Sequence, residues 1–416
     1  MPVEPLDERD LTLLLRRETP LVVAFLAKLV QDLSLAEELM QDTVVASVEQ
    51  WRKTGLPPNP GAYLMKAGRN RAIDLFRKQK READWTRREA READSSHEAI
   101  DEGSMFADER LRLVFTCCHP GLPLESQIAL TLRLVCGLTT PEVARAFLVP
   151  EPTIAQRLVR AKRSISDQAI GYQVPEPDQL ETRLDAVLHV FLAVFNEGHT
   201  ATSGDALTRV DLMEEAQRLT SLVVDALPEE PEARGLLALM QLQASRADAR
   251  VDMNGALVLL EDQDRSTWDQ ALIERGLDNL QLAAARGRPG RFQLHAHIAA
   301  THARATSFAA TDWVRIGHLY RALELLAPSP VITLNRAVAV AMVEGPEAGL
   351  ALLAPLEHQP ALRTYHLLPA TRADFLRRLG RLDEAREAYQ RALSLVTNAA
   401  ERSFLERRLT EVSAPG

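Results

Sequence analysis

Apolar residues recur at intervals of three and four along almost the whole chain, and convincing period-two runs are absent. The stretch 33–51 shows the pattern clearly, with Leu33, Ala36, Met40 and Val44 at this spacing. Such spacing places apolar side chains on one face of an α-helix. Prolines cluster between the periodic segments, for example in PPNPG at 57–61. The pattern predicts an all-α fold.

The same pattern predicts three helices near the N-terminus, over about 9–31, 34–53 and 60–80. Ser34 followed by Glu37 matches a capping box, so Ser34 is expected to be the N-cap of the second helix. Asn59 followed by Pro60 is typical of a helix start and predicts the beginning of the third helix.

A further pair of helices is predicted over 139–165. Thr140 is expected to cap a short helix, and a second helix begins near Pro152 with Ile154 and Leu158 on its inner face. A short helix, a turn and a helix with a basic, amide-bearing outer face is the helix-turn-helix pattern, which reads bases in the major groove. Periodicity alone leaves a solvated helical hairpin open. The outward residues are Thr153, Gln156, Arg157, Arg160, Lys162 and Arg163.

The 416 residues are enough for several domains, and 46 % hydrophobic with 26 % charged residues is an ordinary globular composition. The net charge of −9 argues against nucleic acid if it is taken as one number. Residues 1–170 hold 24 basic and 25 acidic residues, whereas the remainder holds 25 and 33. Within 66–91 there are ten basic and four acidic residues. The acidic excess therefore belongs to the C-terminal part.

The three cysteines, Cys117, Cys118 and Cys136, are too few for a disulfide framework and indicate a reducing cytoplasm. Cys117-Cys118-His119 looks like a metal cluster, but adjacent cysteines do not readily chelate one ion. The N-terminus lacks a signal pattern, and the run 21–30 is too short to span a bilayer. We therefore expect a cytoplasmic protein with no membrane segment, no metal and no cofactor.

Three stretches carry a family resemblance. Residues 31–51 and 60–81 resemble the second region of bacterial sigma factors, the latter through the motif ARN-x-x-I/L-D in the segment 64–74, with Gly68 where alanine is usual. Residues 139–165 resemble the fourth region, through Val143-Ala144, Thr153-Ile154, Arg157-Leu158 and Arg160-Ala161-Lys162. The order of these regions resembles the extracytoplasmic-function class. The resemblance implies two partners, core RNA polymerase and promoter DNA.

The resemblance implies that the helix at 60–80 opens and reads the −10 element. Cationic side chains there suit phosphates, and Asn70 and Asp74 share a face on which they can hydrogen-bond an unstacked base. An ion pair of Asp74 with Arg71 or Lys78 stays open, and Trp51 is expected to pack in the core. The DNA-binding residues predicted on this helix are Lys66, Arg69, Asn70, Arg71, Asp74, Arg77 and Lys78.

The helix-turn-helix would read the −35 element. On the second predicted helix, the resemblance implies a contact with the polymerase clamp, although a solvated charged face is the alternative. The residues concerned are Glu37, Glu38, Gln41 and Asp42. Gly68 is expected to loosen the −10 helix, because glycine lowers helix propensity.

The C-terminal part carries a second resemblance. Residues 370–395 resemble a tetratricopeptide repeat, with Gly380, Ala385 and Tyr389 in place, and 335–356 is a weaker copy. Such repeats stack into a solenoid. The stretches 190–198 and 259–265 resemble the signature of a sigma group with a long helical extension. The polar residues of these two stretches are candidates for a regulatory contact, and a buried charge network and a ligand site are the alternatives. They are Asn196, Glu197, Asp262, Asp264 and Arg265.

The predicted domains are a region 2 domain at 5–81, a flexible charged linker at 82–105, a region 4 helix-turn-helix domain at 106–170 and a helical extension at 180–416. The predicted function is a sigma factor, not an enzyme, regulated by its extension through an intramolecular contact or a regulatory protein. The alternative is a one-component DNA-binding regulator that senses a ligand or protein through its solenoid.

Overall fold

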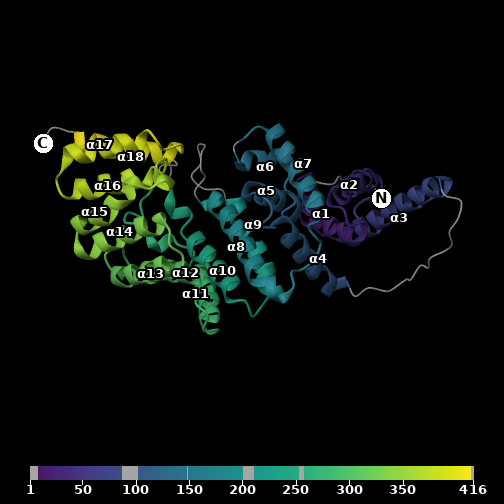
Figure 1. The fold of residues 1–416 in the computed structure, drawn as a ribbon, viewed down its shortest axis with the longest axis horizontal. Coiled ribbons are helices and arrows are strands. Elements are labelled where there is room, and N and C mark those ends of the chain that lie inside the picture. Colours follow the sequence, from purple (N-terminus) through teal and green to yellow (C-terminus); the bar gives the residue numbers. More distant parts are fainter. Residues whose placement is uncertain (1–7, 87–101, 148, 200–209, 253–256, 414–416) are drawn as a thin grey trace. The chain divides into compact units, whose positions relative to one another are not determined.

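The computed structural model describes residues 8–86, 102–147, 149–199, 210–252 and 257–413, and it is helical throughout (Figure 1). The described residues form no β-strand, only an isolated bridge between Val251 and Leu257, so the all-α prediction is confirmed. No helix in these ranges is long and apolar enough to cross a membrane. The elements are α1 (Glu8–Val30), α2 (Leu33–Thr54), α3 (Pro60–Thr86), α4 (Glu102–Cys117), α5 (Leu124–Leu130), η1 (Thr131–Val135), α6 (Thr140–Phe147), α7 (Glu151–Asp167), α8 (Pro177–His199), α9 (Val210–Ala226), α10 (Pro231–Ala244), η2 (Asp248–Arg250), η3 (Arg265–Thr267), α11 (Gln270–Ala284), α12 (Arg291–Arg304), α13 (Trp313–Leu326), α14 (Pro330–Glu344), α15 (Pro346–Leu353), η4 (Ala354–His358), η5 (Pro360–Leu362), α16 (Leu367–Arg378), α17 (Leu382–Leu393) and α18 (Ala399–Ser413).

The chain divides into two compact units, Met1–Phe191 and Leu192–Gly416, and the division falls inside α8. We call them the N-terminal unit and the C-terminal unit and describe each by itself. In the N-terminal unit α1, α2 and α3 pack on one another around buried side chains such as Leu26 and Leu64. Trp51 is 1 % exposed, with its ring 5.8 Å from that of Tyr63, so its predicted place in the core is confirmed.

The N-cap of α2 differs from the prediction by two residues. Asp32, not Ser34, is the N-cap of α2, and its carboxylate accepts hydrogen bonds from the Ser34 and Leu35 backbone N–H groups. A carboxylate reaches these orphan N–H groups and also faces the positive end of the helix dipole. The start of α3 is as predicted, because the Asn59 side chain accepts from the Ala62 N–H.

Gly68 lies where α3 crosses α1 and α2. A methyl group on its Cα would stand 3.3 Å from Leu26 Cδ1 and 3.6 Å from Thr43 Oγ1. Because 3.3 Å is tighter than ordinary van der Waals contact, glycine lets the three helices approach closely. The structure therefore gives Gly68 a packing role, and α3 continues through it without a break.

The rest of the N-terminal unit is built from α4 to α7 and the start of α8. The segment Thr131–Val135 is a turn of π-helix between α5 and α6. Cys117 and Cys118 are both fully buried, and burial raises the pKa of the Cys118 thiol to about 12. Among the residues that the structure describes, no group of three His, Cys, Asp or Glu side chains is arranged to hold a metal ion.

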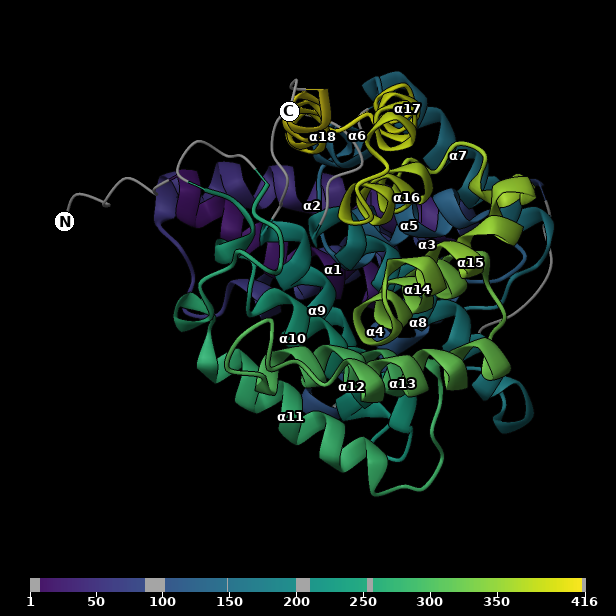
Figure 2. The ribbon, with the colours of Figure 1, turned by 90° about the vertical axis from the view of Figure 1, so that its left-hand side faces the viewer.

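In the C-terminal unit each helix packs mainly on its neighbours along the chain, and α10 to α18 follow one another in an arc (Figure 2). Ala385 and Tyr389 of α17 are buried in one cluster with Ala373 and Leu376 of α16. Gly380 joins these helices with φ +72°, a left-handed conformation that favours glycine. Successive antiparallel pairs of this kind fit a helical array, and the tetratricopeptide assignment itself stays a prediction.

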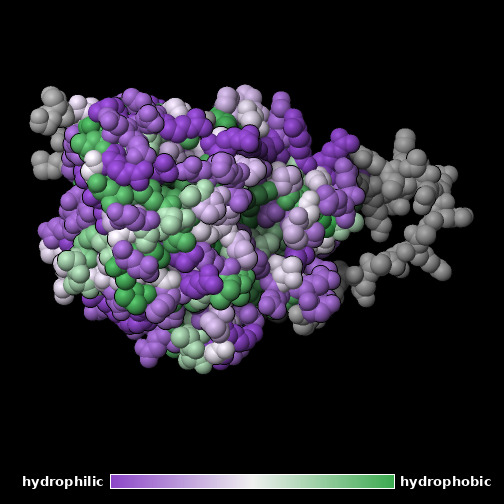
Figure 3. All heavy atoms as spheres, turned by 60° about the vertical axis from the view of Figure 1, so that its left-hand side comes forward, coloured by the Kyte–Doolittle hydropathy of each residue, from purple (hydrophilic) through white to green (hydrophobic). Residues whose placement is uncertain are grey.

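The face drawn in Figure 3 is mixed, with apolar patches between polar ones. In the C-terminal unit the exposed large apolar side chains include Val314, Leu325, Leu326 and Val343.

Candidate nucleic-acid interface

Helices α6 and α7 form the predicted helix-turn-helix. Thr139, one residue before the predicted cap, forms a capping box with Glu142: the Glu142 carboxylate accepts from the Thr139 N–H at 2.7 Å, and the Glu142 N–H lies 3.4 Å from Thr139 Oγ1. Pro150 precedes α7 and gives it no side-chain cap. The inner face of α7 is buried, and its members are Ile154, Leu158, Ala161 and Ile165. The core therefore fixes which face of α7 points outward.

The outer face of α7 carries polar and cationic groups. Thr153, Gln156, Arg160 and Arg163 are exposed, whereas Arg157 and Lys162 are half-buried. Arg160 donates to Gln156 Oε1 over 3.3 Å, a loose exposed contact that bound DNA can replace. Guanidinium and amide groups of this kind hydrogen-bond guanine and adenine edges.

Helix α3 presents a second cationic face. Leu64, Gly68 and Ala72 are buried on one side. On the other side Lys66, Arg69, Asn70, Asp74, Arg77 and Lys78 are exposed, and Arg71 is half-buried. Asp74 lies 3.8 Å from Arg77, whereas Arg71 or Lys78 is the partner considered from the sequence. Both side chains of the pair are about three-quarters exposed, so the pair contributes little to stability.

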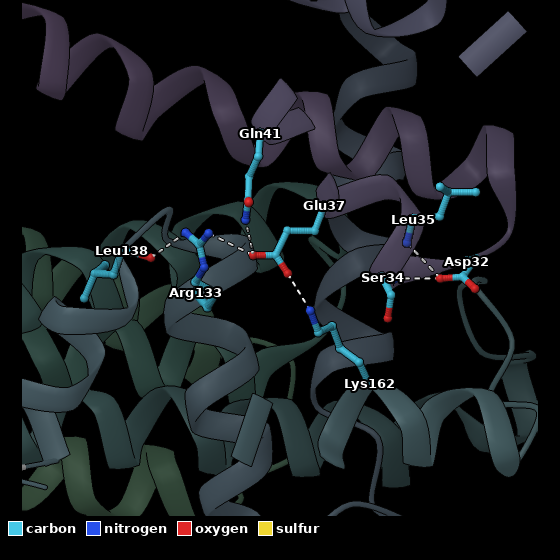
Figure 4. Close-up of polar contacts among 8 residues, drawn as sticks. All are labelled: Asp32, Ser34, Leu35, Glu37, Gln41, Arg133, Leu138 and Lys162. Carbon is cyan, nitrogen blue, oxygen red and sulfur yellow. Dashed lines mark hydrogen bonds and ion pairs between the residues drawn. The ribbon is translucent and has the colours of Figure 1, made fainter. Parts of the chain in front are cut away.

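Helix α2 separates its four predicted polymerase-binding residues into two environments. Glu38, Gln41 and Asp42 are exposed. Glu37 is 6 % exposed, and its carboxylate faces two cations, Arg133 and Lys162 (Figure 4). The structure thus brings one residue of the predicted polymerase set into contact with one residue of the predicted DNA-binding set.

The predicted regulatory residues of the C-terminal unit have separate local roles. Asn196 and Asp262 are exposed and Glu197 is half-buried. Asp264 is the N-cap of η3, and hydrogen bonds from the Ser266 side chain and backbone lower the pKa of its carboxyl group. Arg265 reaches the end of α12, where it donates to the carbonyl oxygens of His302 and Ala305.

Arg250 of the C-terminal unit repeats this pattern. Arg250 is 8 % exposed and donates to the His199 carbonyl at the end of α8. Burial and the neighbouring Arg246 lower the pKa of Arg250 to about 9. Burial, with Arg246 and Arg265 nearby, lowers the pKa of His302 to about 4. These charges are gathered where helices end, and the negative end of each helix dipole faces the guanidinium group.

Several of these residues escaped the sequence interpretation. Arg133, the partner of Glu37, lies inside an apolar periodic stretch. Lys28 and Glu109 are 81 positions apart in the sequence, but Lys28 Nζ lies 2.7 Å from Glu109 Oε1 in the structure. No motif marks such pairs, because each half is an ordinary charged residue in its own helix. Arg250 lies just before the stretch 259–265, and only its burial distinguishes it.

Comparison with protein families now gives these surfaces a context. Residues 14–82 match the model of sigma-70 region 2, and residues 112–165 match the model of sigma-70 region 4. Residues 183–284 match a family of unknown function, DUF6596. No solved structure matches.

An uncharacterized protein of Rhizobium meliloti (strain 1021), R00370, is 43 % identical over 414 residues, covering 97 % of this chain and 96 % of its own.

Regions 2 and 4 on one chain define a sigma factor, the class of transcription factor that directs RNA polymerase to promoters. The chain belongs to the sigma-70 family and, within it, to the extracytoplasmic-function type with a C-terminal extension.

Proposed function

We propose that this sigma factor opens and reads the −10 region through α3 and reads the −35 element through α7. It acts with core polymerase in the cytoplasm, and α2 contributes to polymerase binding through Glu37, Glu38, Gln41 and Asp42. The C-terminal unit regulates this activity, by an intramolecular contact or through a partner protein.

The observation that carries the proposal is the build of α3 and α7. Each has a buried apolar side and an outward side rich in Arg, Lys and amide groups. Phosphate contacts need exposed cations, and base contacts need polar groups that the core does not already occupy. Most of α3 lies in the segment that matches region 2, and most of α7 lies in the segment that matches region 4.

Strand opening is tested with the double substitution Asn70→Ala and Asp74→Ala. Both side chains are exposed, so folding should be retained while initiation on duplex promoters falls by about tenfold or more, the loss of one or two base-directed hydrogen bonds. A promoter template with a pre-opened −10 bubble should restore transcription. Arg52→Ala, an exposed cation on α2 outside the predicted set, is the control. Normal initiation by the double variant on duplex DNA would exclude these two residues.

Regulation by the C-terminal unit is tested with a chain that ends at His199. A chain that ends at His199 retains the whole of α8. We retain this helix because Arg183 of α8 donates to the Phe115 carbonyl of α4 over 2.8 Å, which attaches α8 to the N-terminal unit. A change of promoter occupancy or transcription, in either direction, supports regulation. Unchanged transcription by a folded truncated chain would rule it out.

The same assays separate the alternative function. A one-component regulator protects a duplex without polymerase and opens no strand. A sigma factor gives permanganate-reactive thymines at −10 only when core polymerase is present. Strong protection of the promoter by the free chain, with no polymerase-dependent opening, would favour the regulator.

A further inference from the structure

Glu37 of α2 ties the region 2 helices to the helix-turn-helix within the N-terminal unit (Figure 4). Its Oε1 lies 2.8 Å from a guanidinium nitrogen of Arg133, and its Oε2 accepts from Lys162 Nζ over 2.8 Å. The other end nitrogen of Arg133 donates to the Leu138 carbonyl at 3.0 Å. One carboxylate is therefore connected to α7 directly and to the entry of α6 through Arg133.

A second charged contact joins the same two halves. Lys28 of α1 lies 2.7 Å from Glu109 of α4, whose side chain is 3 % exposed. The Tyr172 hydroxyl stands between α1 and α4, 2.8 Å from the Ala24 carbonyl oxygen and 3.0 Å from that of Glu109. Because the hydroxyl has one hydrogen, these two carbonyls share it. The contact is thus fixed at more than one place.

Backbone packing brings the halves still closer. Gly137, between η1 and α6, has φ +71°, and a methyl group on its Cα would come within 2.7 Å of the Arg16 carbonyl oxygen of α1. Only a residue without a side chain fits there. Helix α1 also packs along α4. The region 2 and region 4 parts therefore form one closed body.

This closed body brings the two proposed DNA-reading helices close together. Gly68 of α3 faces Thr43 of α2, because a methyl group on its Cα would stand 3.6 Å from Thr43 Oγ1. Thr43 is about 9 Å along α2 from Glu37 at about 1.5 Å per residue. Since Lys162 of α7 touches Glu37, α3 and α7 lie on the order of 20–30 Å apart, about two interhelical spacings and a side chain. The −10 and −35 elements are about 25 base pairs apart, or about 85 Å of duplex at about 3.4 Å per base pair.

We propose that the N-terminal unit is a closed resting state of the sigma factor and that Glu37 is its latch. The inference rests on the proposed function, because it assumes that α3 and α7 each read a promoter element and that Glu37 belongs to the polymerase-binding set. In the closed state Glu37 is covered by Arg133 and Lys162, and Lys162 is turned away from DNA. Polymerase and the helix-turn-helix compete for the same carboxylate, so binding polymerase releases the DNA-reading helix.

The closed state depends on the charge of Glu37 because this carboxylate is buried. Removal of Glu37 leaves Arg133 and Lys162 facing each other without their shared anion, and an unpaired buried charge is costly. Separation of the two halves returns both cations to water. The closed state therefore loses its advantage when Glu37 is neutral, whereas Glu38 is exposed one position away and serves as a matched control.

The test measures a distance in the full-length chain without polymerase. Spin labels are attached at Glu49→Cys on α2 and Glu151→Cys on α7, which are both exposed. The native cysteines are at most 1 % exposed and stay unlabelled. Double electron–electron resonance should give one short distance for the otherwise unchanged chain and for Glu38→Gln. Glu37→Gln should raise the open-to-closed ratio by about tenfold or more, seen as a longer and broader distribution.

Two further arms keep the test decisive. Lys162→Gln, which leaves the Glu37–Arg133 pair in place, should open the chain less than Glu37→Gln does. Glu37→Gln combined with Lys28→Gln, which removes both charged contacts, should open it more. Core polymerase should shift the unsubstituted chain to the long distribution. Circular dichroism confirms that each variant keeps its helices.

The inference is overturned if the unsubstituted chain is already open, or if Glu37→Gln and the double variant both keep the short distance. These outcomes do not depend on transcription. A chain that opens as expected but supports no polymerase-dependent initiation contradicts the proposed function and leaves the latch intact. A chain that initiates normally yet never closes contradicts the latch alone.

Discussion

Exposed arginines of α3 and α7 in the N-terminal unit contrast with two arginines of the C-terminal unit that contact the ends of helices. In the N-terminal unit Arg69, Arg77 and Arg160 project from helices α3 and α7 into solvent. In the C-terminal unit Arg250 is buried and Arg265 is half-buried, and both donate to carbonyl groups where helices end. An exposed guanidinium keeps its donors available for phosphate and base edges, whereas a buried one satisfies the chain's own backbone.

The difference teaches that a polar motif does not show by itself whether it serves a partner or the fold. The stretch 259–265 and the helix 64–78 are both rich in charge. Arg265 also stacks 4.8 Å from the Trp268 ring and lies 3.5 Å from Thr311 Oγ1. A side chain with this many internal contacts holds the structure together, so the comparison predicts unlike consequences for substitutions in the two units.

The largest effect is expected for Arg265→Ala. The substitution removes the guanidinium donor from the His302 and Ala305 carbonyl groups at the end of α12. It should lower the free energy of unfolding of the C-terminal unit by about 2–4 kcal/mol. Hydrogen exchange of peptides from α12 and α13 measures this loss. Arg304→Ala, a substitution of an exposed arginine at the end of α12, is the control. Equal protection in both variants would show that Arg265 is not structural.

The next effect is a pH dependence of the C-terminal unit. The pKa of His302 is lowered from 6.5 to about 4 by burial and by Arg246 and Arg265. Between these values the unfolded chain binds a proton that the folded chain does not, so stability falls as the pH drops from about 6.5 to about 4. The loss approaches about 3 kcal/mol at about 1.4 kcal/mol per unit. His302→Gln should flatten this slope in unfolding titrations, and an unchanged slope would exclude His302 as its source.

A smaller effect, confined to DNA, is expected for Arg160→Ala on α7. The side chain is exposed and its contact with Gln156 is loose, so unfolding should be unchanged within about 0.5 kcal/mol. Binding of holoenzyme to the −35 element should weaken by about 1–3 kcal/mol if Arg160 contacts a base. Competition between promoter and non-promoter duplexes measures this. If stability falls while promoter selectivity stays, α7 resembles the C-terminal unit and the comparison fails.

The smallest effect is expected for Asp74→Asn in thermal unfolding. Its pair with Arg77 is exposed and 3.8 Å long, and such surface pairs contribute about 0–1 kcal/mol. The midpoint should therefore stay nearly constant at low and high salt. A clear drop of the midpoint would show that the charges of α3 stabilise the fold and would contradict the distinction between the two units.

Local features of the fold were predictable from the sequence because they depend on neighbours along the chain. The periodicity predicted a helix at 34–53, one residue short of α2 at each end, and Asn59-Pro60 predicted the start of α3. The caps of α2 and α6 were misplaced, since Asp32 and Thr139 are also capping residues and the pattern cannot rank adjacent candidates. The role of Gly68 was missed because propensity describes a single helix, whereas the contact with Leu26 comes from another helix.

The sequence by itself determined that the chain is helical, that it carries sigma regions 2 and 4, and which faces of α3 and α7 turn outward. Periodicity and local motifs contain that information. Only the tertiary structure decided that Glu37 meets Arg133 and Lys162, and that Arg250 and Arg265 meet the ends of α8 and α12. These partners lie 37 to 125 positions apart, and long-range charge pairing follows from how helices pack, which no local pattern records.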